Sequence, residues 1–213
     1  IWCVRGDGQL IALTYQREQE VVAWHRHIIG GSFGTGNAVV ESVAVIPTED
    51  SEYELYVVVK RTINNITRRY VEYLHTFNFT ETDNTSFNYL DSQLSLSKLQ
   101  TTLTAGINAA VTTVPVASVS GLSTAGKIKI GGEIIAYTGI STLNLTGCTR
   151  GQNSTTAVAH LSGAVTKEVV NTISGLNHLE GQTVSILADG ATHPTKVVDA
   201  NGAITLDRFA TDV

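Results

Sequence analysis

Two histidines stand two positions apart in the sequence, at His25 and His27. Side chains two positions apart on a β-strand point to the same face, so this pair could hold a metal ion such as zinc. No third ligand follows at a matching spacing, and histidines on polar strand edges more often act as hydrogen-bonded surface groups. The sequence therefore predicts no metal and no cofactor. The other histidines stand singly and are expected to be structural or exposed, namely His75, His160, His178 and His193.

Carboxylates gather in two short acidic stretches and could supply the pair of acids that glycoside hydrolysis needs. The candidates are Glu18, Glu20, Asp50, Glu52 and Glu54. Acidic loops bring such groups together by chance, and Glu52 and Glu54 flank Tyr53 as the solvated face of an edge strand would. The sequence has no serine on a glycine-flanked elbow and no glycine-rich loop before a helix. We therefore predict no catalytic residues and no enzyme activity.

Four cations stand on either side of the pair Asn64-Asn65. Asparagines of this kind supply the positive φ angles of a tight hairpin turn, which would bring the cations to neighbouring positions. The cations are Lys60, Arg61, Arg68 and Arg69. Such a cluster could contact a phosphate or an acidic partner. Protection of an exposed edge strand against pairing with other chains is the interpretation we favour.

Two kinds of short motif are weaker indications of function. The tripeptide Arg5-Gly6-Asp7 matches the adhesion motif of integrin-type receptors, but Gly8 follows it and a tight turn is the interpretation we favour. Five glycosylation acceptor patterns are expected by chance in a chain this rich in threonine, although they leave a cell-surface adhesin as an alternative. They begin at Asn65, Asn78, Asn84, Asn144 and Asn153.

The composition sets limits on the elements that position these residues. Of the 213 residues, 42% are apolar and 15% are charged, which is enough for one or two buried cores. Frequent threonine and valine, 19 glycines and no methionine favour strands joined by tight turns, so we predict an all-β fold. No run approaches the roughly 18 apolar residues of a membrane-spanning helix. A net charge of -5 argues against a surface that grips nucleic acid.

Three further features concern single residues and the chain as a whole. Cys3 and Cys148 are 145 positions apart and are expected to be free buried thiols. Trp2 and Trp24 are expected in a core or at a subunit interface. The missing methionine and the apolar start predict that the chain is a piece of a longer protein.

Strand-like runs and turns predict three segments. Residues 1–98 read as a meander of about four to six antiparallel strands, with a turn at 16–20. Residues 99–171 are poor in aromatics and rich in Thr, Ala and Ser, which predicts a separate small module with a hairpin around 131–133. Residues 172–213 return to longer strands with turns at Asp189-Gly190 and Asn201-Gly202. The sequence thus predicts an insertion between two parts of one β-domain.

Several ordered strings resemble the tail nozzle family of short-tailed bacteriophages, also described as tail tubular protein B-like. They cover most of the chain outside the middle module. In order they are DGQL (7–10), LTYQREQEV (13–21), AWHRH (23–27), VESVAVIP (40–47), LYVVVKR (55–61), RRYVEYL (68–74), GLNHLEGQTV (175–184) and ADG (188–190).

The middle module is similar to a small β-barrel insert of phage tail proteins that is named after a domain of ubiquitin-activating enzymes (FCCH-like). Its marks are GKIKIG (126–131), EIIAYTG (133–139), LTGCTRGQ (145–152) and AVAH (157–160). No catalytic cysteine or adenylate-binding loop accompanies them, so we infer no conjugation chemistry. The resemblance implies an insert that projects outward.

The nozzle resemblance implies a structural virion protein of the phage tail. In this family, propeller-like β-blades form a homo-oligomeric ring, a hexamer, that contacts other tail proteins such as the tail adaptor and lets DNA pass without specific binding. The family also has a larger amino-terminal region, which is missing here. Two alternatives stay open. One is a carbohydrate- or receptor-binding module on residues 99–171, and the other is a glycan-cleaving enzyme that uses Glu52 and Glu54.

Overall fold

The structure is a computed structural model that describes residues 1–48, 53–75 and 90–213. It is all-β, as expected: antiparallel strands and short 3-10 turns account for the regular structure, and the described residues contain no α-helix. None of these residues form a helix long and apolar enough to cross a membrane. The chain divides into two compact units. Unit 1 comprises Ile1–Ser95, Thr172–Ile186 and Pro194–Thr205, and unit 2 comprises Leu96–Asn171, Leu187–His193 and Leu206–Val213.

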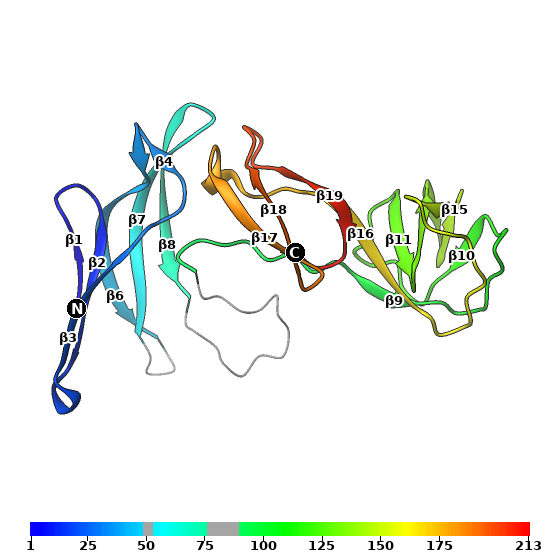
Figure 1. Cartoon of the computed structure of the whole chain (residues 1–213), viewed down its shortest axis with the longest axis horizontal. Helices are drawn as coiled ribbons and strands as arrows, with labels where there is room; N and C mark the ends of the chain where they lie inside the picture. Colours follow the sequence, from blue (N-terminus) through cyan, green and yellow to red (C-terminus); the bar gives the residue numbers. More distant parts are fainter. Residues whose placement is uncertain (49–52, 76–89) are drawn as a thin grey trace. The chain divides into compact units, whose positions relative to one another are not determined.

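The first sheet of unit 1 has the strand order β1-β2-β3 (Figure 1). Its register places Trp2 beside Ala12 and Ala12 beside His25. Gly8 makes the turn before β2, with φ at 84° and its N–H donating to the Arg5 carbonyl over 2.8 Å. A Cβ atom there would lie 2.3 Å from the side chain of Val39, so only glycine fits. The strands are β1 (Trp2–Val4), β2 (Leu10–Gln16) and β3 (Val21–His27).

The second sheet of unit 1 has the order β6-β7-β8. Asn64 and Asn65 join β7 to β8 with φ angles of 51° and 59°, the signature of the tight hairpin turn that the sequence predicts. Alternate β7 side chains are buried from Leu55 to Ile63, so one face of the sheet covers a core. The strands are β6 (Val39–Pro47), β7 (Tyr53–Ile63) and β8 (Ile66–Leu74), and a short ribbon consists of β4 (Ser32–Phe33) and β5 (Gly36–Asn37).

The core of unit 1 joins these two sheets. Leu10 of β2 is buried together with Val40 of β6 and alternate residues of β7, and Trp2 and Val4 pack against the same cluster. Within the described part of residues 1–98, the predicted meander is therefore two three-stranded sheets and a small ribbon instead of one continuous sheet. The turn predicted at residues 16–20 contains the 3-10 turn Arg17–Gln19.

Unit 2 is built on a six-stranded sheet with the order β15-β12-β11-β16-β19, in which β9 also pairs with β16. A three-stranded sheet, β10-β14-β13, contributes Val114 and Leu145 to the same core, which also holds Ile128, Ile135 and Tyr137. The strands are β9 (Gln100–Thr102), β10 (Thr113–Pro115), β11 (Gly126–Ile130), β12 (Glu133–Tyr137), β13 (Gly139–Ser141), β14 (Asn144–Thr146), β15 (Thr149–Gln152), β16 (Val165–Ile173) and β19 (Ile204–Ala210).

The last part of the chain contributes to both units. A two-stranded ribbon pairs β17 (Thr183–Ala188) with β18 (Ala191–Val197) through the predicted turn at Asp189-Gly190. In unit 2, Leu96 and Val213 exchange two backbone hydrogen bonds of 2.7 and 2.8 Å, and Asp189 accepts bonds from Thr211 and Asp212. Unit 2 thus combines the predicted module of residues 99–171 with the final residues of the chain.

Candidate functional site

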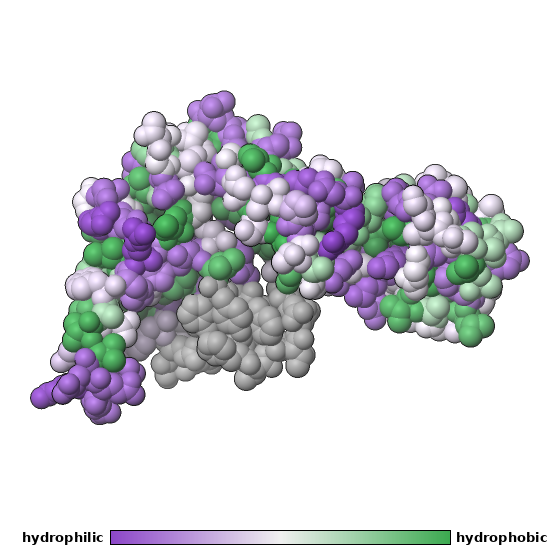
Figure 2. Space-filling view, viewed as in Figure 1, coloured by the Kyte–Doolittle hydropathy of each residue, from purple (hydrophilic) through white to green (hydrophobic). Residues whose placement is uncertain are grey.

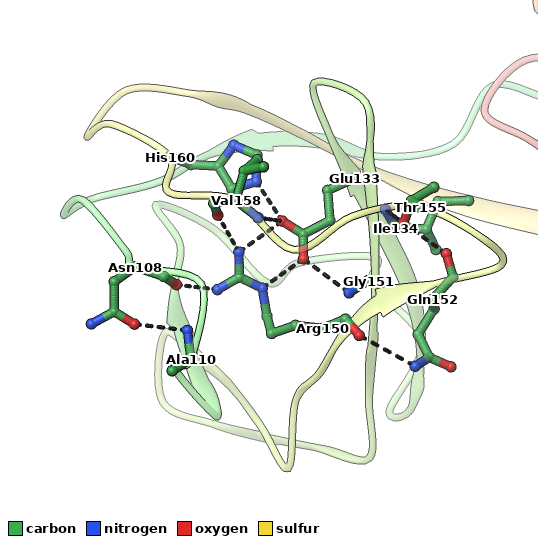
Figure 3. A network of polar contacts seen from close by, with 10 residues as sticks. All are labelled: Asn108, Ala110, Glu133, Ile134, Arg150, Gly151, Gln152, Thr155, Val158 and His160. Atoms are coloured by element: carbon green, nitrogen blue, oxygen red, sulfur yellow. Dashed lines mark hydrogen bonds and ion pairs between the residues drawn. The ribbon is translucent and has the colours of Figure 1, made fainter.

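The most densely bonded polar group of the described residues is the carboxylate of Glu133 in unit 2 (Figure 3). Glu133 begins β12 directly after the Gly131-Gly132 turn, and Arg150 lies on the neighbouring strand β15. The Arg150 guanidinium donates two hydrogen bonds to the carboxylate, of 2.8 and 2.7 Å, and His160 Nε2 donates a third of 2.8 Å. The backbone N–H groups of Gly151 and Val158 complete the set.

These contacts determine what the Glu133 carboxylate can do chemically. Burial raises the pKa of Glu133, but the hydrogen bonds from Arg150, His160 and the two backbone groups outweigh burial and lower it to about 2. The carboxylate is therefore an anion whose oxygens are already occupied by donors. The donors of the Arg150 guanidinium are also occupied, since it donates to the carbonyls of Val158 and Asn108 as well. The arrangement ties three loops of unit 2 together and has no free acid or base.

A second polar cluster lies in unit 1, on the face of β3 that carries the two predicted histidines. His25 Nδ1 and His27 Nε2 face each other across 2.9 Å. The far nitrogen of His27 lies 2.6 Å from the carboxylate of Asp91, and the far nitrogen of His25 lies 3.2 Å from the Thr14 hydroxyl. Trp2 contacts both imidazole rings, with ring centroids 4.9 Å from His27 and 6.2 Å from His25. The sequence indicated the histidine pair but not Asp91, which is 64 positions from His27.

The basic cluster forms the hairpin that the sequence predicts, with Lys60 opposite Arg69 and Arg61 opposite Arg68. The cations do not form one free patch, however. Lys60 and Arg69 both pair with Glu41, at 3.2 and 2.7 Å.

Arg61 has a different environment from the other cations of the hairpin. It is 1% exposed, pairs with Glu72 through both terminal nitrogens and donates to the Gly30 carbonyl. Gly31, at a φ of 96°, is next to this guanidinium, and a Cβ atom there would lie 2.4 Å from the carbonyl of His178. Three of the four cations are thus paired with two carboxylates of the same unit, and Glu41 is shared by two of them.

Among the described residues of unit 1, one face of the β1-β2-β3 sheet carries exposed apolar side chains. Tyr15 and Val22 are opposite each other on β2 and β3, as are Leu13 and Trp24. Leu10 and Ala12 point to the other face and are buried, and His25 lies on that other face beside Ala12 but is exposed. Tyr15 is 61% exposed, Val22 63% and Trp24 59%. We call Ile1, Leu13, Tyr15, Val22 and Trp24 the β2–β3 apolar face.

Figure 2 shows green apolar side chains above the purple tip of the hairpin between β2 and β3. This tip is the polar turn that includes Arg17–Gln19. Trp24, expected in a core or at a subunit interface, belongs to this exposed face, whereas Trp2 packs against the core of unit 1.

The outer face of the β6-β7-β8 sheet also carries aromatic side chains. Tyr56 and Tyr73 are opposite each other in the register, with ring centroids 5.9 Å apart, and Val71 on the same face is 73% exposed. A pocket of about 320 Å³ in unit 1 is lined by residues that include Asp7, Gln9, His27 and Phe33. Asp7 is paired with Arg5 and His27 with Asp91, so we assign the pocket no chemistry of its own.

The remaining candidate residues are separated or occupied. Glu54 accepts a hydrogen bond from the Tyr56 hydroxyl, and Glu18 and Glu20 lie in the exposed turn between β2 and β3. Asp50 and Glu52 lie outside the described residues, as do the acceptor patterns at Asn78 and Asn84. The structure therefore does not test the proposed pair of Glu52 and Glu54.

The adhesion motif and the cysteines have local structural explanations. Arg5 and Asp7 pair with each other over 2.5 Å at the turn before β2, as the turn interpretation expects. Both cysteines are free. Cys148 is buried, and burial raises the pKa of its thiol, whereas Cys3 is only partly buried. Within the described part of the chain, no group of three or more His, Cys, Asp or Glu side chains is placed to hold a metal ion.

Comparisons with known proteins add no family to this description. Neither a scan of protein-family models nor a search of curated proteins finds a match to the chain.

Proposed function

We propose that this chain is a non-enzymatic structural subunit of a bacteriophage tail, a nozzle-like protein that associates with copies of itself around a passage for DNA. The phage assignment rests on the ordered sequence strings of the nozzle family. The observation that supports a building-block role is the β2–β3 apolar face.

An apolar face of this kind has an unfavourable free energy when it stays in contact with water. Exposed apolar patches on soluble proteins mark interaction sites when they are contiguous, and aromatic side chains contribute most of the binding energy at protein interfaces. Tyr15, Val22 and Trp24 are neighbours on two paired strands, so they form one surface. Covering this surface with another copy of the protein would stabilise the assembly by roughly 25 cal/mol for each Å² of apolar surface removed from water.

The charged groups support a role without catalysis. Glu133, Arg150 and Arg61 are among the charged groups whose burial would suit an active site, and each is held by several partners from its own unit. Glu168 is buried as well and is held by the Ser123 N–H and Lys98. Three cations of the basic hairpin are paired with Glu41 and Glu72. Together with a net charge of -5, this pairing favours a wall past which DNA slides without specific binding.

The finer architecture is part of the proposal. The antiparallel meander β6-β7-β8 suits a propeller-like blade, although it has three strands where propeller blades usually have four. In unit 2, two sheets share one core that includes Val114, Ile128 and Leu145, an arrangement that suits a small barrel-like insert. The proposed partners are sister copies, a hexamer by analogy with the family, and other tail proteins such as the adaptor, in the virion.

The carbohydrate-binding alternative has less support on residues 99–171. Protein surfaces commonly bind sugars by stacking them on exposed aromatic rings, and this part of the chain contains a single aromatic residue, Tyr137. Tyr137 is buried, and its hydroxyl donates to the Ser123 carbonyl. A glycan array with the full chain tests this alternative. Reproducible glycan binding that is lost when exposed residues of 99–171 other than Tyr137 are substituted would favour it over the nozzle.

The assembly proposal is tested by measuring the mass of the full chain in solution with light scattering and by imaging it in negative stain. We expect ring-shaped oligomers. Val22→Glu places a charge in the middle of the β2–β3 apolar face and is expected to give a monomer with unchanged circular dichroism. Val197→Glu is the matched control, because Val197 lies on β18 and is 62% exposed, nearly the same as Val22.

Two results would contradict the proposal. A chain that stays monomeric at every concentration and is absent from purified virions by mass spectrometry is not a tail subunit. Oligomers that both valine variants disrupt equally, or that neither disrupts, would show that the β2–β3 apolar face is not the contact surface.

A further inference from the structure

We propose that His25 and His27 form a two-histidine clamp for one divalent transition-metal ion such as Zn²⁺, with water supplying the remaining ligands. The sequence argued against a metal because no third ligand follows at a suitable spacing. The structure adds a different observation, namely the partners that hold the two rings from behind.

The clamp begins with the two nitrogens that face each other. His25 Nδ1 and His27 Nε2 are 2.9 Å apart. Zinc binds histidine nitrogens at about 2.0–2.1 Å with tetrahedral angles, which separates two such nitrogens by about 3.3 Å. An opening of a few tenths of an ångström would therefore admit the ion. His25 is exposed and His27 is half-buried, so an ion can reach both rings from solvent.

The far nitrogen of each ring has the partner that a metal-bound histidine needs. Ligating histidines donate their second N–H to a carboxylate, carbonyl or hydroxyl, which fixes the ring and strengthens the bond to the metal. His27 Nδ1 has Asp91 at 2.6 Å, and His25 Nε2 has the Thr14 hydroxyl at 3.2 Å. Asp91 is itself held in place, because its second oxygen accepts the Ile28 N–H over 3.0 Å.

The same contacts allow the change of proton position that metal binding requires. With both rings neutral and no metal, His27 donates from Nδ1 to Asp91, and its Nε2 accepts the Nδ1–H of His25. With the metal bound, both facing nitrogens must be unprotonated, so the proton of His25 moves to Nε2. Thr14 supports both states, since its hydroxyl can donate to that nitrogen or accept from it. No proton needs to leave the pair.

The surrounding sheet keeps the two rings together. Both histidines point to the same face of β3, and Ala12 is opposite His25 in the register, where its small side chain leaves room for Trp2 to contact both rings. Since the described residues contain no group of three metal ligands, water must complete the coordination. The clamp is therefore expected to bind an ion reversibly instead of holding it as a structural centre.

The test is isothermal titration of ZnCl2 into the full chain. We expect one Zn²⁺ per chain. Asp91→Asn replaces the carboxylate that accepts the His27 Nδ1–H with a neutral amide and should weaken the Zn²⁺ affinity by about 10- to 100-fold. His25→Gln and His27→Gln remove a ligand each and should weaken it further. His75→Gln is the matched control, because it removes a histidine outside the cluster and should leave the affinity unchanged. Circular dichroism of each variant checks that it folds.

A spectroscopic measurement reads the tautomer directly. In long-range ¹H–¹⁵N spectra, Zn²⁺ should move the proton of His25 from Nδ1 to Nε2 and leave that of His27 on Nδ1. Saturable binding with this change supports the clamp. Absence of saturable binding, affinity that survives both histidine substitutions, or a His25 tautomer that does not change would each overturn it.

Discussion

At the scale of the residue, buried ions are the most consequential feature of this chain. Glu133 in unit 2 and Arg61 in unit 1 are each 1% exposed and are held by partners of opposite charge. Buried ion pairs contribute little net stability against an apolar replacement of similar shape, but removal of one partner leaves a charge without compensation. Both residues should therefore be sensitive to substitution.

The Glu133 carboxylate should make stability depend on pH. Its pKa is about 2 in the folded chain, below the ordinary value of 4.5, so its contribution is fully present above pH 4.5 and is lost as pH falls toward 2. The contribution corresponds to about 3 kcal/mol in the free energy of unfolding. Denaturant unfolding from pH 7 to pH 2 should show Glu133→Gln destabilised by about 3–5 kcal/mol at pH 7 and approaching the native chain at low pH.

A matched substitution separates this effect from a general loss of charge. Glu18→Gln removes a carboxylate from the exposed turn and should change the free energy of unfolding by less than about 0.5 kcal/mol. A Glu133→Gln variant with the stability and pH profile of the native chain would show that the hydrogen bonds in Figure 3 do not stabilise unit 2.

Arg61 and Arg68 offer a direct comparison, because they are opposite each other on one hairpin. Arg61→Ala leaves Glu72 without its partner and opens a gap beside Gly30, so we expect a loss of about 3–5 kcal/mol in urea unfolding. Arg68 is exposed, and Arg68→Ala should cost less than about 0.5 kcal/mol. Equal effects would mean that burial does not distinguish the two arginines.

At the scale of the element, the hairpin of β7 and β8 depends on its two-residue turn. Asn64 and Asn65 both adopt positive φ, which costs most other residues about 1–2 kcal/mol. Asn65→Ala should therefore lower the free energy of unfolding by about 1 kcal/mol. Asn65→Gly should be neutral or slightly stabilising, because glycine adopts this conformation freely. Thermal unfolding by circular dichroism compares the two, and the opposite ranking would contradict this account of the turn.

The elements that the sequence predicted correctly share a clear local signal. The runs at Leu10, Val21 and Val39 alternate in polarity or are rich in β-branched residues, and the asparagine pair marks the turn between β7 and β8. Strand β18 was not predicted, because its run ATHPTKV is polar and contains Pro194. Strand β16 was not predicted either, although it pairs with β9, β11 and β19 in the largest sheet of unit 2.

The polar clusters illustrate why sites are harder to predict than strands. The histidine pair is local and follows from the period of a strand. Its partner Asp91 is 64 positions along the chain from His27, and Glu133 meets its partners Arg150 and His160 at separations of 17 and 27. Contacts over such distances depend on how sheets pack, which no local pattern encodes. The pairing of the basic hairpin with Glu41 and Glu72 was missed for the same reason.

At the scale of the whole molecule, self-association should appear as a link between concentration and stability. Anything that binds only the folded state stabilises it, so the melting temperature of an associating chain rises with its own concentration. We expect this rise for the native chain and for Val197→Glu, and a melting temperature independent of concentration for Val22→Glu. Scanning calorimetry over a hundredfold range of concentration measures it, and a flat response for the native chain would contradict assembly.

Strand β3 has a further consequence for the protein outside its assembly. It ends the order β1-β2-β3, so its outer backbone groups find no ladder partner among the described strands, and its sequence VVAWHRH contains one arginine and no proline. Such segments seed cross-β fibrils when nothing shields them. The charge of Arg26 should oppose the pairing of β3 with strands of other chains. We expect that isolated subunits kept in solution slowly form amyloid-like fibrils. The Arg26→Val variant should form these fibrils faster than the native chain.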